Sequence, residues 1–316
     1  MKRALLLLAL SLAAAAALAQ FPSRPITILV PIPPGGAPDI AARLIGQKLS
    51  EHIGQPVVIE NRVGANGNIA ADLVAKSQPD GHTLGLLADS QITINPHLYK
   101  MPFDALRELA PVATVAANQF VLTVNPSLPV RSFPEFVEHA RQANPPLAYA
   151  SGGNGSQHHL TMEMLKRRAG INLLHVPFKG GAPAAAATVA GDTAAVWSGS
   201  SNAAQIKAGR LRPLAVSGAQ RSAQYPELPT IGEFYPGFEN SIWLGIFSPA
   251  GIPENVLGKL RSELQRVLEN PEIKQKMNAA GGLDPYITTP EEFAAVIKRD
   301  YEKYAKVVKD IGIRLD

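Results

Sequence analysis

Short apolar runs alternate with amphipathic stretches along most of this chain. Apolar and β-branched residues fill 26–30, which prolines bound, and predominate in 57–61 and 83–87, as expected for strands. Stretches with helical spacing of apolar residues follow two of them, at 39–49 and 69–77. This alternation predicts an α/β fold, with a mostly parallel sheet flanked by helices.

A second alternating block lies between residues 120 and 216. Its predicted strands are 120–124, 147–150, 173–176, 193–197 and 214–216, and its predicted helices are 133–142, 157–169 and 182–190. Two such blocks, in a chain too long for one compact core, predict two domains.

The C-terminal part is mainly helical, with predicted helices at 254–269, 271–279 and 290–309. These helices have no strands of their own, so they must pack on one of the two α/β units. The strand-like segment 241–247 is where we expect the chain to return to the first unit. The predicted organisation is therefore a discontinuous first domain, 20–122 plus 241–316, and a second domain, 123–240, with a ligand cleft between them.

The N-terminus has the pattern of a secretory signal peptide. Met1-Lys2-Arg3 precedes an apolar run, 4–18, which ends at the small-residue site Ala17-Leu18-Ala19. The run is about fifteen residues, shorter than the ~20 that a transmembrane helix needs, although an uncleaved anchor is the alternative. We expect a signal peptide at 1–19, cleavage near Ala19, and a soluble periplasmic protein.

Amino-acid composition excludes several classes of site and partner. The chain contains no cysteine, which excludes disulfides, thiolate metal sites and a cysteine nucleophile. Removal of Lys2 and Arg3 with the signal peptide lowers the formal charge from +4 to +2, because 28 basic and 26 acidic residues remain. The basic residues are scattered, so no nucleic-acid partner is predicted. We expect a monomer.

Two glycine-rich loops, the first at 34–39 and the second at 151–156, give the main indication of function. Each follows an apolar strand and leads into a helix, where glycine allows close approach of the backbone and free N–H groups attract anions. Loops at the carboxyl ends of strands are where open α/β sheets bind ligands. Ordinary tight turns capped by serine are the alternative. The predicted ligand-binding residues in these loops are Pro34, Gly35, Gly36, Ala37, Asp39, Ser151, Gly152, Asn154, Gly155 and Ser156.

Other polar or aromatic residues near predicted strand ends are secondary candidates. Ser90 and Gln91 follow the strand at 83–87, Phe178 and Lys179 follow the strand at 173–176, and Ser198 follows the strand at 193–197. His159 lies in the helix after the second loop. Each can line a pocket, but each is also compatible with a capped turn, a solvated lysine or a histidine satisfied beneath the loop.

Several chemistries lack their motifs. No glycine-rich loop leads into Gly-Lys-Ser or Gly-Lys-Thr, and position 158 is histidine where a dinucleotide loop needs glycine. Tyr149 breaks the nucleophile-elbow pattern around Ser151, which leaves His158 and His159 as weak partners for a serine hydrolase. The His-Glu-x-x-His spacing is missing, and we expect no metal and no cofactor.

The chain resembles the Bug family of periplasmic receptors, the substrate-binding components of tripartite tricarboxylate transporters. The matching segments run through the mature chain and include Arg24-Pro25-Ile26, Pro33-Pro34-Gly35-Gly36, Gly54-Gln55-Pro56-Val57-Val58, Glu60-Asn61-Arg62, Gly67-Asn68-Ile69, Pro79-Asp80-Gly81, Tyr149-Ala150-Ser151, His175-Val176-Pro177-Phe178-Lys179-Gly180, Pro249-Ala250-Gly251 and Thr289-Pro290-Glu291.

This resemblance implies a two-lobed periplasmic binding protein of the Venus-flytrap type, similar to type II, with a small carboxylate in the cleft and no catalysis. It also implies that one carboxylate is held by the backbone and hydroxyl groups of the two loops. Three positions depart from the family: Ser156 is often threonine, Phe178 is usually tyrosine, and Ser198 is aspartate in many members. The last departure makes an amino-acid ligand less expected.

Three functions follow as hypotheses. The first is a transport receptor that closes on a small mono- or dicarboxylic acid and delivers it to membrane transporter subunits. The second is a ligand sensor with the same binding chemistry whose partner is a sensor-kinase ectodomain. The third is a periplasmic serine hydrolase that uses Ser151.

Overall fold

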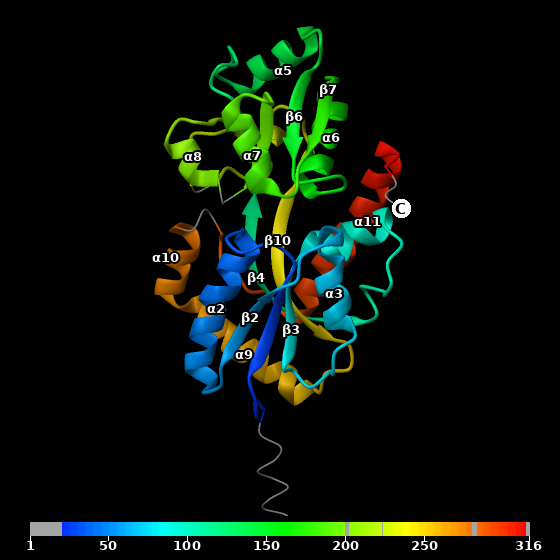
Figure 1. The fold of residues 1–316 in the computed structure, drawn as a ribbon, viewed down its shortest axis with the longest axis vertical. Helices are drawn as coiled ribbons and strands as arrows, with labels where there is room; N and C mark the ends of the chain where they lie inside the picture. Colours follow the sequence, from blue (N-terminus) through cyan, green and yellow to red (C-terminus); the bar gives the residue numbers. More distant parts are fainter. Residues whose placement is uncertain (1–20, 200–201, 223, 280–282, 314–316) are drawn as a thin grey trace, which may run out of the picture.

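The computed structural model describes residues 21–199, 202–222, 224–279 and 283–313, and shows two α/β lobes stacked along the long axis of the molecule (Figure 1). The predicted signal peptide lies outside the described residues. Among these residues, no helix has the length and apolar character to cross a membrane.

The first lobe is built on a five-stranded sheet over the described residues. Its order is β2 (Val57–Asn61), β1 (Ile26–Val30), β3 (Thr83–Ala88), β10 (Ser241–Pro249) and β4 (Leu109–Gln119). One face packs against α2 (Ala37–Ile53), α9 (Glu254–Glu269) and α10 (Pro271–Ala279), and the other against α3 (Asn68–Ala75) and α11 (Pro290–Ile311). The C-terminal helices therefore pack on the first sheet.

The second lobe repeats this arrangement. Its sheet has the order β7 (Leu173–Pro177), β6 (Leu147–Ser151), β8 (Ala195–Ser198), β5 (Val121–Val124) and β9 (Arg212–Val216). The core on one face is closed by α5 (Phe133–Gln142) and α6 (Gln157–Ala169), and that on the other by α7 (Gly181–Ala190). The short elements α8 (Ala203–Lys207) and η4 (Ile231–Glu233) follow β8 and β9.

Both sheets are mixed, with two parallel and two antiparallel pairings each among the described strands, where the sequence predicts mostly parallel ones. The antiparallel pairings come from the strands at the lobe junction. β4 leads into β5 through Phe120 alone, and β10 returns antiparallel beside β4, with Ser241 opposite Gln119. The lobe junction is therefore a pair of adjacent strands.

The observed elements differ from the predicted ones at several places, among them β4, α8 and the start of α2. β4 is absent from the prediction, because its Ala-rich sequence with Pro111 lacks a clear period, and its partner β10 is distant in the chain. Helix α2 begins at Ala37 with Gly36 at its N-cap, before the predicted cap at Asp39. Pro38 fits this first turn because the N–H that proline lacks has no partner within the helix there.

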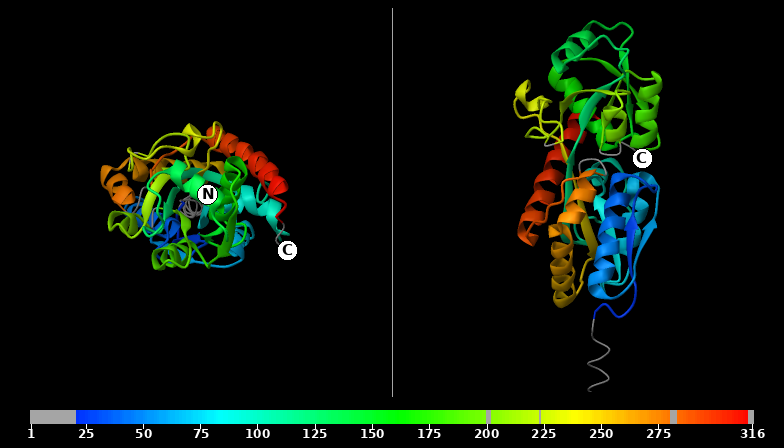
Figure 2. Two further views of the ribbon diagram at one scale, coloured as in Figure 1. Left: turned by 90° about the horizontal axis from the view of Figure 1, so that it is seen from above. Right: turned by 90° about the vertical axis from the view of Figure 1, so that its left-hand side faces the viewer.

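Helix α11 belongs to the first lobe but reaches the second (Figure 2). The Tyr304 hydroxyl donates to Asn240 Oδ1 at 2.6 Å, and the Asn240 amide in turn donates to the Thr161 hydroxyl on α6. All three side chains are buried. This chain of hydrogen bonds ties both lobes together behind the connecting strands.

Candidate functional site

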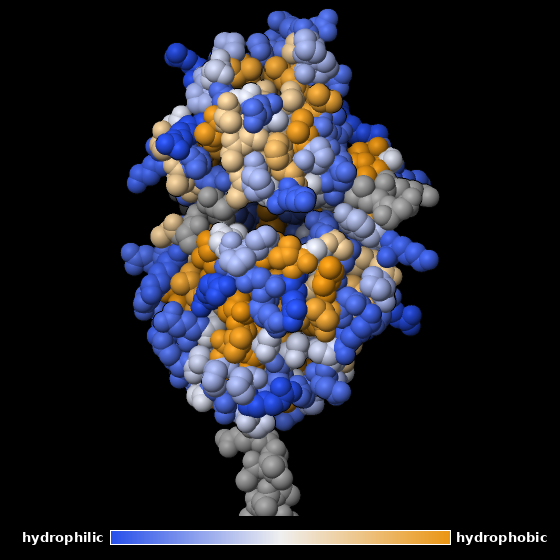
Figure 3. Space-filling model, viewed as in Figure 1, coloured by the Kyte–Doolittle hydropathy of each residue, from blue (hydrophilic) through white to orange (hydrophobic). Residues whose placement is uncertain are grey.

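The carboxyl ends of the parallel strands of the two lobes face each other. β1, β2 and β3 end at the upper edge of the first lobe, and β6, β7 and β8 end at the lower edge of the second (Figure 1). The molecular surface is hollowed between these edges (Figure 3). Both glycine-rich loops lie at this boundary, where ligands of open α/β sheets bind.

The loop before α2 is held by Asp39. Its Oδ2 accepts from the Gly35 amide at 2.9 Å, and the carboxylate also accepts from Arg43 and from Asn61 Nδ2. Burial acts to raise the pKa of Asp39, but these hydrogen bonds outweigh it and hold the pKa below its ordinary value. The Asp39 side chain thus shapes the loop, while Pro34 and Gly35 are exposed at its tip.

Helix N-termini gather along the two facing edges. α2, α3 and α7 each have a glycine at the N-cap, Gly36, Gly67 and Gly180 respectively, and none of the three has a side-chain cap. All three follow strands whose carboxyl ends lie at the cleft. Uncapped first-turn N–H groups carry partial positive charge, so the cleft edges favour an anion.

The second loop is stabilised by its own serines. Ser156 caps α6, because its hydroxyl accepts from the His159 amide at 3.3 Å and donates to Gly153 O at 2.7 Å. Ser151 Oγ is fully buried and lies 2.6 Å from His175 Nε2. Gly155 donates its amide to His159 Nδ1 at 3.1 Å. The side chains of Ser151 and His159 therefore support the loop from beneath, and the loop presents Gly152 and Asn154 outward.

Two histidine rings form a stack under this loop. His159 and His175 are 3.9 Å apart between ring centroids with an interplanar angle of 9°, and Tyr149 stacks on the other side of His175. Burial, helped by the neighbouring His159, lowers the pKa of His175 to about 4. Burial also lowers the pKa of His159. Both rings are thus neutral near pH 7.

The lobes touch at the end of the cleft near α4 (Asn95–Leu98). The Tyr99 hydroxyl donates to Asn154 O at 3.3 Å, and Gln157 Nε2 donates to the fully buried Asp89 carboxyl group. Ser90 begins the short helical segment η2 (Ser90–Ile94), and Gln91 is occupied by hydrogen bonds to Ala88 N and Asn66 O. Gln91 therefore braces the first-lobe edge, with η1 (Ala65–Gly67) packed against it.

The remaining predicted residues divide into two groups. Phe178 is half-buried against α7, and Lys179 is exposed, both on the loop between β7 and α7. Ser198 is fully buried, and its hydroxyl is 2.7 Å from Thr123 Oγ1 within the second sheet. The Ser198 side chain is thus engaged inside the lobe rather than directed to the cleft.

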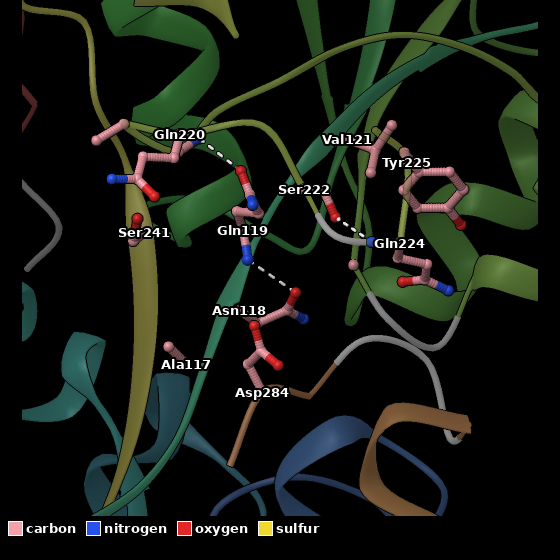
Figure 4. Close-up of a pocket in the computed structure, with 13 residues that line it drawn as sticks. Ala117, Asn118, Gln119, Val121, Gln220, Ser222, Gln224, Tyr225, Ser241 and Asp284 are labelled. Carbon is pink, nitrogen blue, oxygen red and sulfur yellow. Dashed lines mark hydrogen bonds between the residues drawn. The ribbon is translucent and has the colours of Figure 1, made fainter. Parts of the chain in front are cut away.

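A polar cavity of ≈ 230 Å³ lies where the lobes join (Figure 4). The residues that line it include Ala117, Asn118, Gln119, Val121, Gly199, Gly218, Ser222, Tyr225, Ser241 and Asp284. None of the sequence-predicted site residues lines it. The cavity is assembled from β4, β10 and the segment after β9, which the sequence pattern alone does not bring together. The polar pair Asn118-Gln119 after a long apolar run is the one local signal for it.

Two facing α/β lobes with anion-attracting edges and a hollow between them define a solute-binding receptor of the two-lobed type. The chain belongs to the tripartite tricarboxylate transporter receptor family, because the family model described as "Tripartite tricarboxylate transporter family receptor" matches residues 41–313. Members of this family are receptors and not enzymes, which removes the serine-hydrolase hypothesis. The geometry agrees, since the Ser151 hydroxyl is buried.

The similarity to known proteins extends over nearly the whole chain. Protein BugT of Bordetella pertussis is 34% identical over 300 residues, which are 93% of this chain and 91% of BugT. The structure of Rpa4515 from R. palustris with adipate is 32% identical with a TM-score of 0.86, and covers 93% of this chain and 99% of that one. MatC from Rhodopseudomonas palustris with bound malate is 28% identical with a TM-score of 0.80, and covers 91% and 100%.

Proposed function

We propose that this protein captures a small organic acid in the cleft between its lobes and delivers it to the membrane subunits of a tripartite tricarboxylate-type transporter. The observation that carries the proposal is the gathering of uncapped helix N-termini on the facing edges, with Gly36, Gly67 and Gly180 at their N-caps. An anion at this position receives hydrogen bonds from backbone N–H groups without a charged side chain.

The lobes would close on the ligand by bending at the strands that join them, because β4 passes into β5 through a single residue, Phe120. Closure of this hinge type is common among two-lobed binding proteins. The relatives with adipate and malate support a small carboxylate as the class of ligand. The family and the predicted signal peptide both support a location in the periplasm.

A thermal-shift screen with paired ligands tests the proposal. Each carboxylic acid is compared with its uncharged amide, for example adipate with adipamide, because the pair differs mainly in charge. A ligand that binds only the native state at 100 times its Kd stabilises by about 2.7 kcal/mol. The expected result is a rise in Tm for at least one acid and none for its amide. Equal effects of acid and amide, or no effect of any acid, would overturn the proposal.

Transport and signalling differ in the partner of the closed form. Under our proposal, deletion of the membrane transporter subunits abolishes uptake of the acid that raises Tm. Uptake that persists without those subunits, together with capture of the liganded protein by a sensor-kinase ectodomain, would support the signalling role instead.

A further inference from the structure

The cavity at the lobe junction is built from both lobes. Asn118 and Ser241 belong to strands of the first sheet, while Gly218 and Tyr225 belong to the second lobe. Gly199, which directly follows β8, also lines the cavity. Because β8 ends at the cleft edge, Gly199 places one wall of the cavity at that edge. A ligand that reaches into it contacts both lobes at the point where they bend.

Four amide side chains line this cavity, and hydrogen bonds to backbone N–H groups orient two of them, Asn118 and Gln119. Asn118 Oδ1 accepts from the backbone N–H of Gln119 at 2.8 Å, and Gln119 Oε1 accepts from the backbone N–H of Gly218 at 3.1 Å (Figure 4). Each side-chain oxygen therefore already has a backbone donor. Within the part of the chain that the structure describes, the NH₂ groups of these two amides have no acceptor and remain to donate.

Gly218 leaves the space that the Gln119 side chain occupies. A Cβ atom at Gly218 would lie 2.3 Å from Gln119 Oε1 and 2.9 Å from its Cδ, closer than real contacts allow. The buried glycine thus makes room for the Gln119 amide. The position of the Gln119 side chain therefore depends on glycine at residue 218.

The charge of the cavity limits what enters. Among the described residues that line it there is no lysine, arginine or histidine, and the one charged residue is Asp284. Asp284 is fixed at the cavity by two backbone hydrogen bonds with Ala117, of 2.8 and 2.9 Å. A second carboxylate of a ligand would find no cation here and would meet the Asp284 charge. Neutral groups that both donate and accept, such as hydroxyls, fit amide NH₂ donors and a carboxylate acceptor.

We infer that the junction cavity is a subsite for an uncharged, hydroxyl-bearing part of the ligand, with the Asn118 and Gln119 NH₂ groups as donors and Asp284 as acceptor. This inference rests on the proposed function, in which helix N-termini in the cleft hold the carboxylate. It makes the preferred ligand a hydroxylated monocarboxylic acid rather than a dicarboxylic acid with a bare chain.

The test uses three six-carbon acids, namely gluconate, which carries hydroxyls, hexanoate, which has none, and adipate, which has a second carboxylate. Calorimetry on the mature chain should give a Kd for gluconate at least ~10-fold below that for hexanoate or adipate, since only gluconate has hydroxyls that pair with the two amide donors and the Asp284 acceptor.

The variant Gln119→Glu keeps the oxygen that accepts from Gly218 and replaces the NH₂ donor by an acceptor. It should weaken gluconate ~10-fold and leave hexanoate within about 3-fold, because any long-range charge repulsion acts on both monocarboxylates alike. Asn118→Asp is a second variant with the same logic, and its unfolding transition shows whether it folds. Gln47→Glu, on the exposed surface of α2, is the matched charge control.

The outcomes separate the two proposals. Adipate or hexanoate binding as tightly as gluconate, or equal losses for gluconate and hexanoate in Gln119→Glu, overturns the subsite and leaves the carboxylate receptor standing. No binding of any acid in the wider screen overturns both.

Discussion

Gln157, the first residue of α6, donates a side-chain hydrogen bond to the carboxyl group of Asp89 in the opposite lobe. The two residues are 7% and 0% exposed, so this contact lies inside the molecule. Thr161 donates to the Gln157 carbonyl at 2.7 Å and accepts from Asn240. The N-terminus of the helix that follows the second loop is thus anchored to the first lobe.

Asp89 should titrate unusually. Burial, with the nearby Asp300 carboxyl group, raises the pKa of Asp89 well above its ordinary value, although Lys303 and Gln157 oppose this. The unfolded chain releases this proton near pH 4, so above that pH the folded form binds more protons and stability falls as pH rises. Asp89→Asn should therefore raise the free energy of unfolding at pH 7, by an amount that shrinks toward pH 4.

Denaturant unfolding of Asp89→Asn and wild type between pH 4 and pH 8 measures this difference. Asp192→Asn, at an exposed position after α7, is the control. A loss of stability that is constant across this range would show instead that Asp89 is ionised and paired in the folded protein.

The histidine stack predicts a second pH dependence. Because the pKa of His175 falls to about 4 in the folded protein, the unfolded chain binds more protons between pH 4 and about 6.5. Stability should therefore decrease as pH falls through this window. His175→Gln places an amide near the Ser151 hydroxyl and removes the titration, so its loss of stability over the window should be smaller. His139→Gln on α5 is the control, and an unchanged slope in His175→Gln would contradict the assignment.

Ser156 links stability and binding. Ser156→Ala removes the N-cap of α6 and should cost about 1 kcal/mol of unfolding free energy, and it should also weaken the ligand, because the second loop loses its bond to Gly153 O. Ser156→Thr keeps the hydroxyl and should behave like wild type. Equal losses of stability in both variants, measured by urea unfolding, would exclude capping as the cause.

Gly67 should tolerate no side chain. Its φ is 89°, and a Cβ there would lie 2.6 Å from Gln91 Nε2 and 2.9 Å from Pro31 Cβ. Gly67→Ala should destabilise by roughly 1–3 kcal/mol and disturb the first-lobe edge. Gly258→Ala, at an open position within α9, should instead stabilise by about 0.5–1 kcal/mol. Similar effects in both variants, measured by thermal unfolding, would count against this reading of Gly67.

Much of the fold is readable from local pattern, and the site is readable in part. The helices Gln157–Ala169 and Glu254–Glu269 have the predicted bounds, because the apolar period acts within each segment and Ser156 and Gly170 cap the first of them. Asn118 and Ser241 line the cavity at the lobe junction only because segments far apart in the chain come into contact. Ser198 and Asp39 have the right chemistry at strand ends, but only the folded chain shows that neighbouring side chains already occupy them.

Lobe closure on the ligand can be measured directly with two spin labels. The sequence contains no cysteine, so the double variant Val58→Cys and Leu174→Cys carries two unique sites, one per lobe, at positions that are 49% and 60% exposed. Double electron–electron resonance with and without a saturating organic acid from the thermal-shift screen gives the distance between them. The account predicts that the acid shortens this distance, and an unchanged distance distribution at saturation would contradict it.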